Sequence, residues 1–254
     1  MQLIIQSQFQ ELNSTIVSCI ENFNTSGSLF VDGKRNKIKL FKTDAATLNI
    51  KSFKVPNTIN QVVYKFFRKS KAQRSFEFAN RLLKNGIKTP QPIAYAEDYT
   101  FFGLKSSFYV CEHLQVDLTF RELVEVLDYP DYDNILSQFM QFCFLLHEKG
   151  IEFLDHSPGN TLIKKVSDST YEFYLVDLNR MNFLTEMSFE KRMKNLSHLT
   201  PRKDMVAQMS KEYSKLYSNE TEVKIFQKMW EYTDDFQKKY HQKIRFKKKL
   251  KFGK

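Results

Sequence analysis

The sequence is short of cysteine and has no long hydrophobic run, and each shortage excludes a class of structure. Its three cysteines are scattered and odd in number, so we expect reduced thiols in a cytoplasmic protein and no zinc site. No stretch approaches the roughly 20 apolar residues that a membrane-spanning helix needs. Residues 1–6 lack the basic start and long apolar run of a secretory signal, so we expect none. At 254 residues, 42% of them hydrophobic, the chain can form one large domain or two lobes.

Acidic residues are outnumbered, because 39 Lys and Arg face 29 Asp and Glu and leave a net charge of +10. Much of the excess lies in residues 65–74 and 238–251. A solvated basic face is one explanation. The other is an anionic membrane surface, where each basic residue contributes about 1 kcal/mol and the interspersed Phe and Leu suit the interface. We therefore expect peripheral association with an anionic membrane. We expect no nucleic acid partner, since the sequence has no helix-turn-helix, RRM or KH signature.

The first half of the chain has the patterns of β-strands with one helix. An apolar run, an Asp-Gly turn and an alternating run predict a hairpin over residues 28–41, and residues 48–53 predict a third strand. Apolar residues at helical spacing over 76–83 predict the helix. Ser70 and Ser75 are both candidates for its N-cap.

The second half has mainly helical patterns. A helix is expected to begin near residue 119, with Thr119 or Asp117 as its cap, and a second covers 135–147 with a broad apolar stripe. Residues 161–176 predict a hairpin, and from Met187 onward the pattern is helical and charged. No internal repeat is visible.

The most informative feature is a polar loop that precedes this hairpin. It carries Asp155 and, five residues later, Asn160, while Asp177 ends the hairpin's second strand. This spacing is typical of kinases, in which the first Asp accepts a proton from the attacking hydroxyl and the Asn and second Asp bind Mg²⁺ beside the ATP phosphates. An ordinary polar turn between two strands is the alternative, because Asp, Ser, Pro, Gly and Asn are common turn residues.

The order of the elements resembles the protein-kinase-like plan, a bilobal α+β fold. By that resemblance, residues 1–112 form a β-rich, nucleotide-binding N-lobe with one helix. Residues 113–254 form a mainly helical C-lobe with the catalytic hairpin and a basic tail. The loop 155–160 is similar to the kinase D-x-x-x-x-N loop, which makes Asp155 the catalytic base and Asn160 and Asp177 the metal ligands.

The same resemblance implies roles for residues of the first lobe. Lys51 is similar to the strand lysine that holds the α and β phosphates of ATP, and Glu77 to its ion-pair partner on the helix. Glu112 and Leu114 fall where a hinge would offer backbone groups to adenine. Two alternatives stay open: Lys54 as the phosphate ligand, and Glu77 as a surface residue of an amphipathic helix.

Departures from ordinary protein kinases favour a small-molecule substrate. No glycine-rich loop is present, so residues 34–36 are candidates to cover the phosphates. Phe153-Leu154 replaces the usual His-Arg before the base, and Ser157 replaces the Lys that is typical of serine/threonine kinases. Leu178-Asn179 replaces Phe-Gly after the second Asp, and no Ala-Pro-Glu motif follows.

Several segments, taken in order, resemble the lipopolysaccharide inner-core kinases, which phosphorylate Kdo or heptose on the lipid A core of Gram-negative bacteria. The matching segments are Val55–Asn57, Arg68–Ala72, Arg74–Glu77, Gly86–Tyr95, Leu146–Ile151, Val176–Arg180 and Arg192–Leu196.

This resemblance implies ATP, Mg²⁺ and a sugar hydroxyl on an anionic Kdo-lipid A-type molecule, at the inner face of the inner membrane. Kdo and heptose both stay open. Two other functional classes also stay open. One is a protein kinase, including an autophosphorylating tyrosine kinase. The other is a pseudokinase that binds lipid or partner proteins without catalysis.

Overall fold

The computed structural model describes residues 1–44, 46–54, 69–101 and 103–252, with side chains to residue 247. They form two compact units. Unit 1 comprises residues 1–115 together with 176–179, and unit 2 comprises 116–175 and the chain from 180 onward. The predicted N-lobe, 1–112, and C-lobe, 113–254, stay predictions as functional lobes. The segments 55–57 and 65–68, which contributed to the family resemblance and to the basic stretch, lie outside the described residues.

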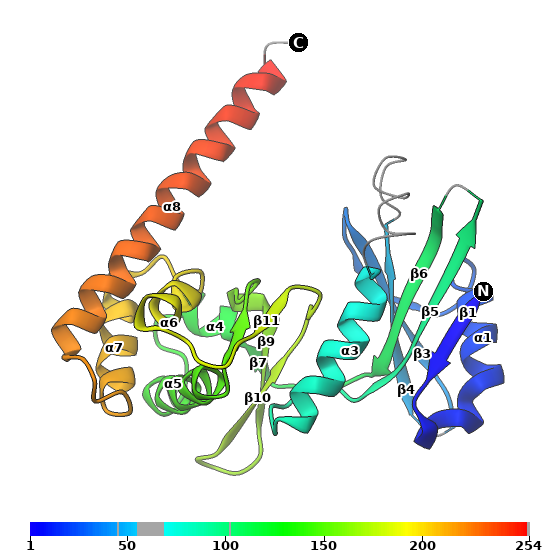
Figure 1. Cartoon of the computed structure of the whole chain (residues 1–254), viewed down its shortest axis with the longest axis horizontal. Coiled ribbons are helices and arrows are strands. Elements are labelled where there is room, and N and C mark those ends of the chain that lie inside the picture. The colour runs from blue at the N-terminus through cyan, green and yellow to red at the C-terminus, as the bar shows by residue number, and fades with distance from the viewer. Residues whose placement is uncertain (45, 55–68, 102, 253–254) are drawn as a thin grey trace. The chain divides into compact units, whose positions relative to one another are not determined.

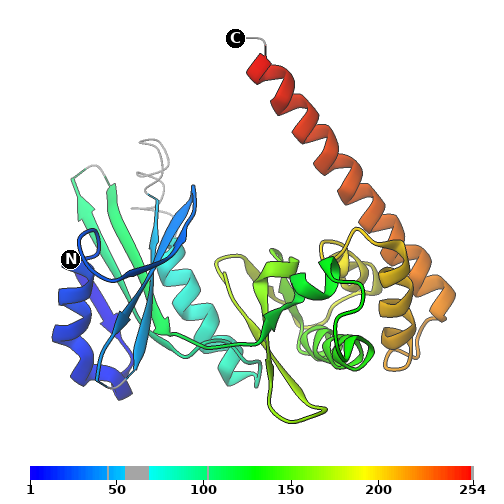
Figure 2. The ribbon, with the colours of Figure 1, turned by 180° about the vertical axis from the view of Figure 1, so that it is seen from behind.

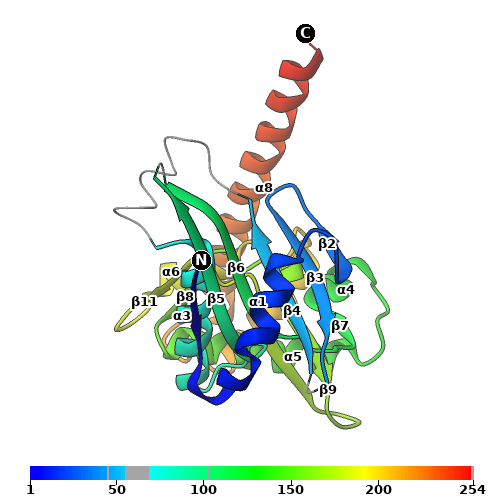
Figure 3. The ribbon, with the colours of Figure 1, turned by 90° about the vertical axis from the view of Figure 1, so that its right-hand side faces the viewer.

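Unit 1 is built on one antiparallel sheet with the strand order β1-β5-β6-β4-β3-β2, seen face-on in Figure 3. Its strands are β1 (Gln2–Ile5), β2 (Ser28–Asp32), β3 (Asn36–Lys42), β4 (Thr47–Phe53), β5 (Pro92–Thr100) and β6 (Gly103–Glu112). The hairpin predicted over residues 28–41 is confirmed, because β2 pairs with β3 and Asp32 lies opposite Lys37. The predicted strand at 48–53 is confirmed as β4.

Two helices pack on opposite faces of this sheet, whereas the sequence predicted only one (Figure 1). The unpredicted helix is α1 (Asn13–Glu21), which follows the short 3-10 helix η1 (Ser7–Leu12). Ile16 and Ile20 of α1 pack with Leu48 and Ile50 of β4 in one buried cluster. Because strand side chains alternate, Lys51 of β4 points to the other face.

The predicted helix is α3 (Lys71–Lys84), which packs on β5 and β6. Its cap is Ser70, whose hydroxyl accepts a 3.0 Å hydrogen bond from the backbone N–H of Gln73. Ser75 lies inside the helix and is buried. The helix ends before Gly86, which has a left-handed φ of 70°.

Unit 2 is mainly helical. Its helices are α4 (Phe120–Glu125), α5 (Tyr132–Glu148), α6 (Phe189–Leu196), α7 (Lys203–Ser214) and α8 (Glu222–Phe252), and its strands are β7 (Leu118–Thr119), β8 (Ile151–Phe153), β9 (Thr161–Lys165), β10 (Tyr171–Leu175) and β11 (Met181–Phe183). Thr119 is the cap of α4 and forms a capping box with Glu122. The predicted hairpin is confirmed as β9 and β10. Most of the predicted apolar stripe of α5 lies in the core around Phe139, but Leu145 is 41% exposed.

Helix α8 has a packed part and an exposed part within unit 2 (Figures 1 and 2). Its first half contacts α6 and α7 and buries Ile225, Met229 and Thr233. Farther along, Tyr240 and Phe246 are 51% and 64% exposed. No helix among the described residues is long and apolar enough to cross a membrane.

Candidate active site

The loop between β8 and β9 is held by its own polar groups and by the strand β11. The Asn160 side chain donates a 2.8 Å hydrogen bond to the backbone oxygen of Asp155, which closes the loop on itself. The N–H of Leu154 donates to the backbone oxygen of Arg180, at 3.1 Å. His156 is fully buried against the rings of Phe139 and Phe153. The backbone at Asp155 is thereby fixed, and its side chain lies at the surface of unit 2, where it is 31% exposed.

Asp155 forms an ion pair with Arg180. The Arg180 Nη1 donates to Asp155 Oδ1 at 2.9 Å, and the Arg180 side chain is 58% exposed. The electrostatic neighbours of His198, just past α6, are Asp155, Arg180 and Lys194. Burial lowers the pKa of His198 more than the Asp155 carboxylate raises it. The loop therefore carries a carboxylate within a mainly basic neighbourhood.

Lys51 and Asp177 form the corresponding ion pair in unit 1. The Lys51 Nζ lies 2.6 Å from Asp177 Oδ1, and the Lys51 side chain is only 11% exposed. The Asn179 side chain donates to the same oxygen at 2.7 Å. Asp177 has a left-handed φ of 60°, which Asp and Asn adopt more readily than other non-glycine residues. The backbone and two donors together fix this carboxylate.

Further cations surround the Lys51–Asp177 pair. Lys71, the first residue of α3, interacts electrostatically with Arg35, Asp177, Arg74 and Lys51. Burial and the neighbouring cations, Arg35 foremost, lower the pKa of Lys71, and the single carboxylate offsets them only in part. Asp177 is thus one anion among several cations, an arrangement that favours a polyanionic ligand. The sequence indicated Arg35 as a phosphate-covering candidate, whereas Lys71 was predicted only as part of the basic stretch at residues 65–74.

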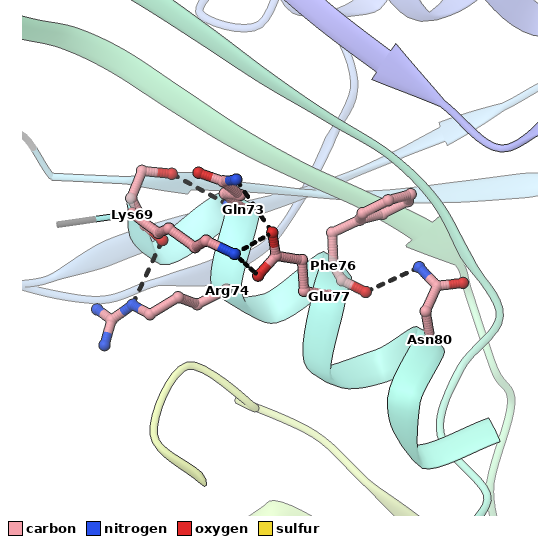
Figure 4. A network of polar contacts seen from close by, with 7 residues as sticks. Lys69, Gln73, Arg74, Phe76, Glu77 and Asn80 are labelled. Atoms are coloured by element: carbon pink, nitrogen blue, oxygen red, sulfur yellow. Dashed lines mark hydrogen bonds and ion pairs between the residues drawn. The ribbon is translucent and has the colours of Figure 1, made fainter. Parts of the chain in front are cut away.

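The predicted ion pair between Lys51 and Glu77 does not form in this structure. Both carboxylate oxygens of Glu77 accept from Lys69 Nζ at 2.7 Å, and one also accepts from the Gln73 side chain at 3.0 Å (Figure 4). Lys51 instead binds Asp177. The competition is local, because Lys69 precedes the helix by two residues and Gln73 lies one turn before Glu77. The role of Glu77 at the nucleotide stays a prediction.

The structure places Lys51 and Lys54, the two candidates for the phosphate-binding lysine, on opposite faces of the sheet. Lys54 is exposed and borders a cavity of about 220 Å³ with Phe23 and Ser52, on the α1 face of the sheet. Lys51 lies on the opposite face and holds Asp177. This geometry favours Lys51 over Lys54 as the phosphate ligand.

Glu112 and Leu114 lie at the end of β6, just before the division at residue 115. The N–H of Glu112 already donates to Gln91, and the N–H of His113 donates to Thr47. Among the described residues the Leu114 N–H has no hydrogen-bond partner. That group is the better hinge candidate to donate to adenine.

The residues expected to bind a metal offer oxygen ligands. Asp177 supplies a carboxylate and Asn160 an amide oxygen, which are the donor types that Mg²⁺ prefers. Within the described residues, no group of three or more His, Cys, Asp or Glu is placed to hold an ion. The donor types suit the predicted ion, and its binding by these two residues stays a prediction.

Comparison with known proteins gives the family and the fold. Residues 51–231, more than half of the chain, match the model of the lipopolysaccharide kinase (Kdo/WaaP) family. The solved structure described as "WaaP in complex with acyl carrier protein" is similar with a TM-score of 0.64 at 15% identity, over 94% of this chain and 99% of that one. This likeness confirms the predicted protein-kinase-like fold. No functionally curated protein matches the sequence significantly. The chain belongs to the lipopolysaccharide kinase (Kdo/WaaP) family.

Proposed function

We propose that this protein transfers the γ-phosphoryl group of ATP to a sugar hydroxyl, on Kdo or heptose, of a Kdo-lipid A-type acceptor. The observation that carries the proposal is the 2.6 Å ion pair between Lys51 and Asp177. In a kinase the strand lysine binds the phosphates and an aspartate binds the metal beside them, and the Lys51–Asp177 contact brings together the residues predicted for these two roles. The family supports the reaction class, because its members are lipopolysaccharide kinases.

In the proposed reaction Asp155 accepts the proton of the acceptor hydroxyl, whose oxygen attacks the γ-phosphorus. The bond between that phosphorus and the β–γ bridging oxygen breaks, and ADP leaves with the electron pair of that bond. Asn160 holds the Asp155 loop closed and, with Asp177, would hold Mg²⁺. The ion would supply positive charge to the phosphate oxygens.

The cations around Asp177 take the place of the missing glycine-rich loop in this proposal. Lys51, Lys71 and Arg35 gather positive charge in unit 1, where a triphosphate would need it. They would bind the phosphates through side chains, whereas a glycine-rich loop uses backbone N–H groups.

The test is phosphate transfer from ATP to Kdo-lipid A by the wild type and Asp155→Ala. We expect a loss on the order of 10²-fold or more in kcat, as for removal of a general base. Glu152→Ala is a matched control, because Glu152 is a partly buried carboxylate on β8 that contacts Asn182 and Lys191. Transfer to peptide but not lipid would favour a protein kinase. Equal transfer by wild type and Asp155→Ala would refute the assignment of the base.

The exposed part of α8 is proposed to bind the anionic membrane that carries the acceptor. Lys239, Lys243 and Arg245 are exposed there beside the aromatic rings of Tyr240 and Phe246. Deletion of residues 243–254 should weaken binding to vesicles that contain anionic lipid, and the loss should shrink at high salt. The solved WaaP structure contains acyl carrier protein, so a protein partner is the competing proposal. Tail-dependent binding to that protein, with unchanged vesicle binding, would favour it.

A further inference from the structure

The ion pair between Arg180 and Asp155 is open to exchange. It consists of one hydrogen bond, from Arg180 Nη1 to Asp155 Oδ1, and its side chains are 58% and 31% exposed. Exposed pairs of this kind contribute little to stability, because water screens the two charges. A ligand anion with two oxygens can engage the guanidinium through two parallel hydrogen bonds, which is the stronger geometry. Such a ligand would displace the carboxylate at little cost.

The neighbourhood of this pair also favours an incoming anion. Lys194, in the last turn of α6, is exposed and has no acidic partner within the described part of the chain. Lys194 and Arg180 both act electrostatically on His198, and Asp155 is the one carboxylate among these groups. If Asp155 were released from Arg180, two exposed cations would remain for a ligand.

The pair matters because of the role of Asp155. The carboxylate keeps lone pairs for a hydroxyl proton, but the Arg180 guanidinium occupies one side of Oδ1. A group that takes Arg180 away from Asp155 would therefore clear that side of the base for the acceptor hydroxyl.

We propose that Arg180 recognises a carboxylate or phosphate of the acceptor, close to its reactive hydroxyl, and that this exchange clears the approach of that hydroxyl to Asp155. The inference rests on the proposed sugar kinase function and adds a requirement on its acceptor. The hydroxyl must lie about 2.6–3.2 Å from Asp155 and the anion about 2.7–2.9 Å from Arg180, so both groups belong on one sugar ring or on adjoining groups. A neutral acceptor would have to break the Arg180–Asp155 pair without replacing it.

The test compares a Kdo glycoside with its methyl ester, which lacks the negative charge. For the wild type we expect a kcat/KM about tenfold or more higher with the free acid, since a charge-assisted hydrogen bond is lost with the ester. Arg180→Gln should abolish this preference, mainly through a KM for the acid raised about tenfold or more. Arg180→Lys should keep part of it. Lys191→Gln is the matched control, because Lys191 is an exposed cation of α6 that faces Glu152.

Binding measured by calorimetry separates this inference from the proposed function. If the wild type phosphorylates neither these glycosides nor Kdo-lipid A, the proposed function fails, and binding of acid against ester still tests Arg180. Equal binding and equal turnover of acid and ester by the wild type would overturn the inference. So would an Arg180→Gln variant that loses kcat equally with both acceptors, because Arg180 would then only orient Asp155. Thermal unfolding should show that Arg180→Gln is folded, since the pair is exposed.

Discussion

Two aspartates of this protein each form an ion pair with a cation, and the pairs differ in how firmly they are held. Asp177 binds Lys51 at 2.6 Å, and the lysine is 11% exposed. Asp155 binds Arg180 at 2.9 Å, and the arginine is 58% exposed. Asp177 has a second donor in Asn179, whereas the Asp155 side chain has only Arg180 within the described residues.

The difference suits two tasks. A carboxylate that holds a metal and phosphates must keep its place, and a pair with a nearly buried lysine and a second donor is costly to break. A carboxylate that accepts a proton must be reachable by the acceptor, and a weak exposed pair permits this. The same type of contact therefore has a fixed form in unit 1 and an exchangeable form in unit 2.

The largest loss of activity is expected from Asp177→Asn, which removes the negative charge of the Asp177 side chain and keeps its size. Transfer to Kdo-lipid A should fall at least as far as for Asp155→Ala, on the order of 10²-fold or more, because the developing phosphate charge loses its metal. The loss should appear in kcat at saturating acceptor. A milder loss than that of Asp155→Ala would remove the distinction between the two pairs.

Replacement of the lysine in the fixed pair should have the next largest effect. Lys51→Met should lower kcat/KM for ATP by about 10- to 100-fold, since a hydrogen bond between charged partners is lost. Lys54→Met is the matched control and should stay within about twofold, because Lys54 lies on the α1 face. Equal losses of kcat/KM in the two variants would mean that Lys54 is again a candidate for the phosphate-binding lysine.

The units should also differ in their response to acid. Burial lowers the pKa of His147 to about 3 and that of His156 to about 4, and both residues lie in unit 2. Their pKa values in the unfolded chain are about 6.5, so between that pH and the folded values only the unfolded state binds the proton. Below pH 6.5 each should therefore remove about 1.4 kcal/mol from the free energy of unfolding per pH unit.

Urea titrations at pH 7.5 and pH 5, followed by hydrogen exchange, measure this loss and locate it. It should appear in unit 2, and His156→Phe should reduce it, since the His156 ring packs between Phe139 and Phe153. Equal loss of protection in both units would contradict the prediction.

The smallest change in stability is expected from Glu77→Gln. The carboxylate of Glu77 pairs with Lys69, whose side chain is 56% exposed, so the free energy of unfolding should change by less than about 1 kcal/mol. Activity shows whether the contact with Lys69 persists in the working enzyme. A loss comparable to that of Lys51→Met would mean that Glu77 leaves Lys69 for Lys51 during catalysis.

Local sequence signals predicted elements well, and contacts between distant residues poorly. Periodicity gave β4, α5 and the hairpin of β9 and β10, because alternation and helical spacing are written in neighbouring residues. Helix α1 was missed although Leu12, Ile16 and Ile20 recur at helical spacing, since the helix has only nine residues and no side chain caps its start.

The candidate site was predicted as a set of residues and not as a set of contacts. Asp155, Asn160 and Asp177 follow a recognisable spacing, so sequence alone could name them. The partner of Asp155 could not be found this way, because Arg180 lies 25 residues away and only the fold brings it close. Lys69 lies only 8 residues from Glu77, but the family resemblance assigned Glu77 to Lys51. For Arg180 the available signal was its position three residues after Asp177.

The left-handed backbone of Asp177 has a consequence for how tolerance to mutation would be measured. At φ 60°, Asn or Gly fits with little strain, whereas a β-branched residue would strain the chain whatever its chemistry. In a scan of all substitutions, protein abundance should therefore fall most for Val, Ile and Thr at this position. Activity should fall for every substitution, including those that leave abundance unchanged. The difference between the abundance profile and the activity profile would separate two effects at Asp177: backbone strain, which lowers abundance, and loss of the carboxylate, which lowers activity alone.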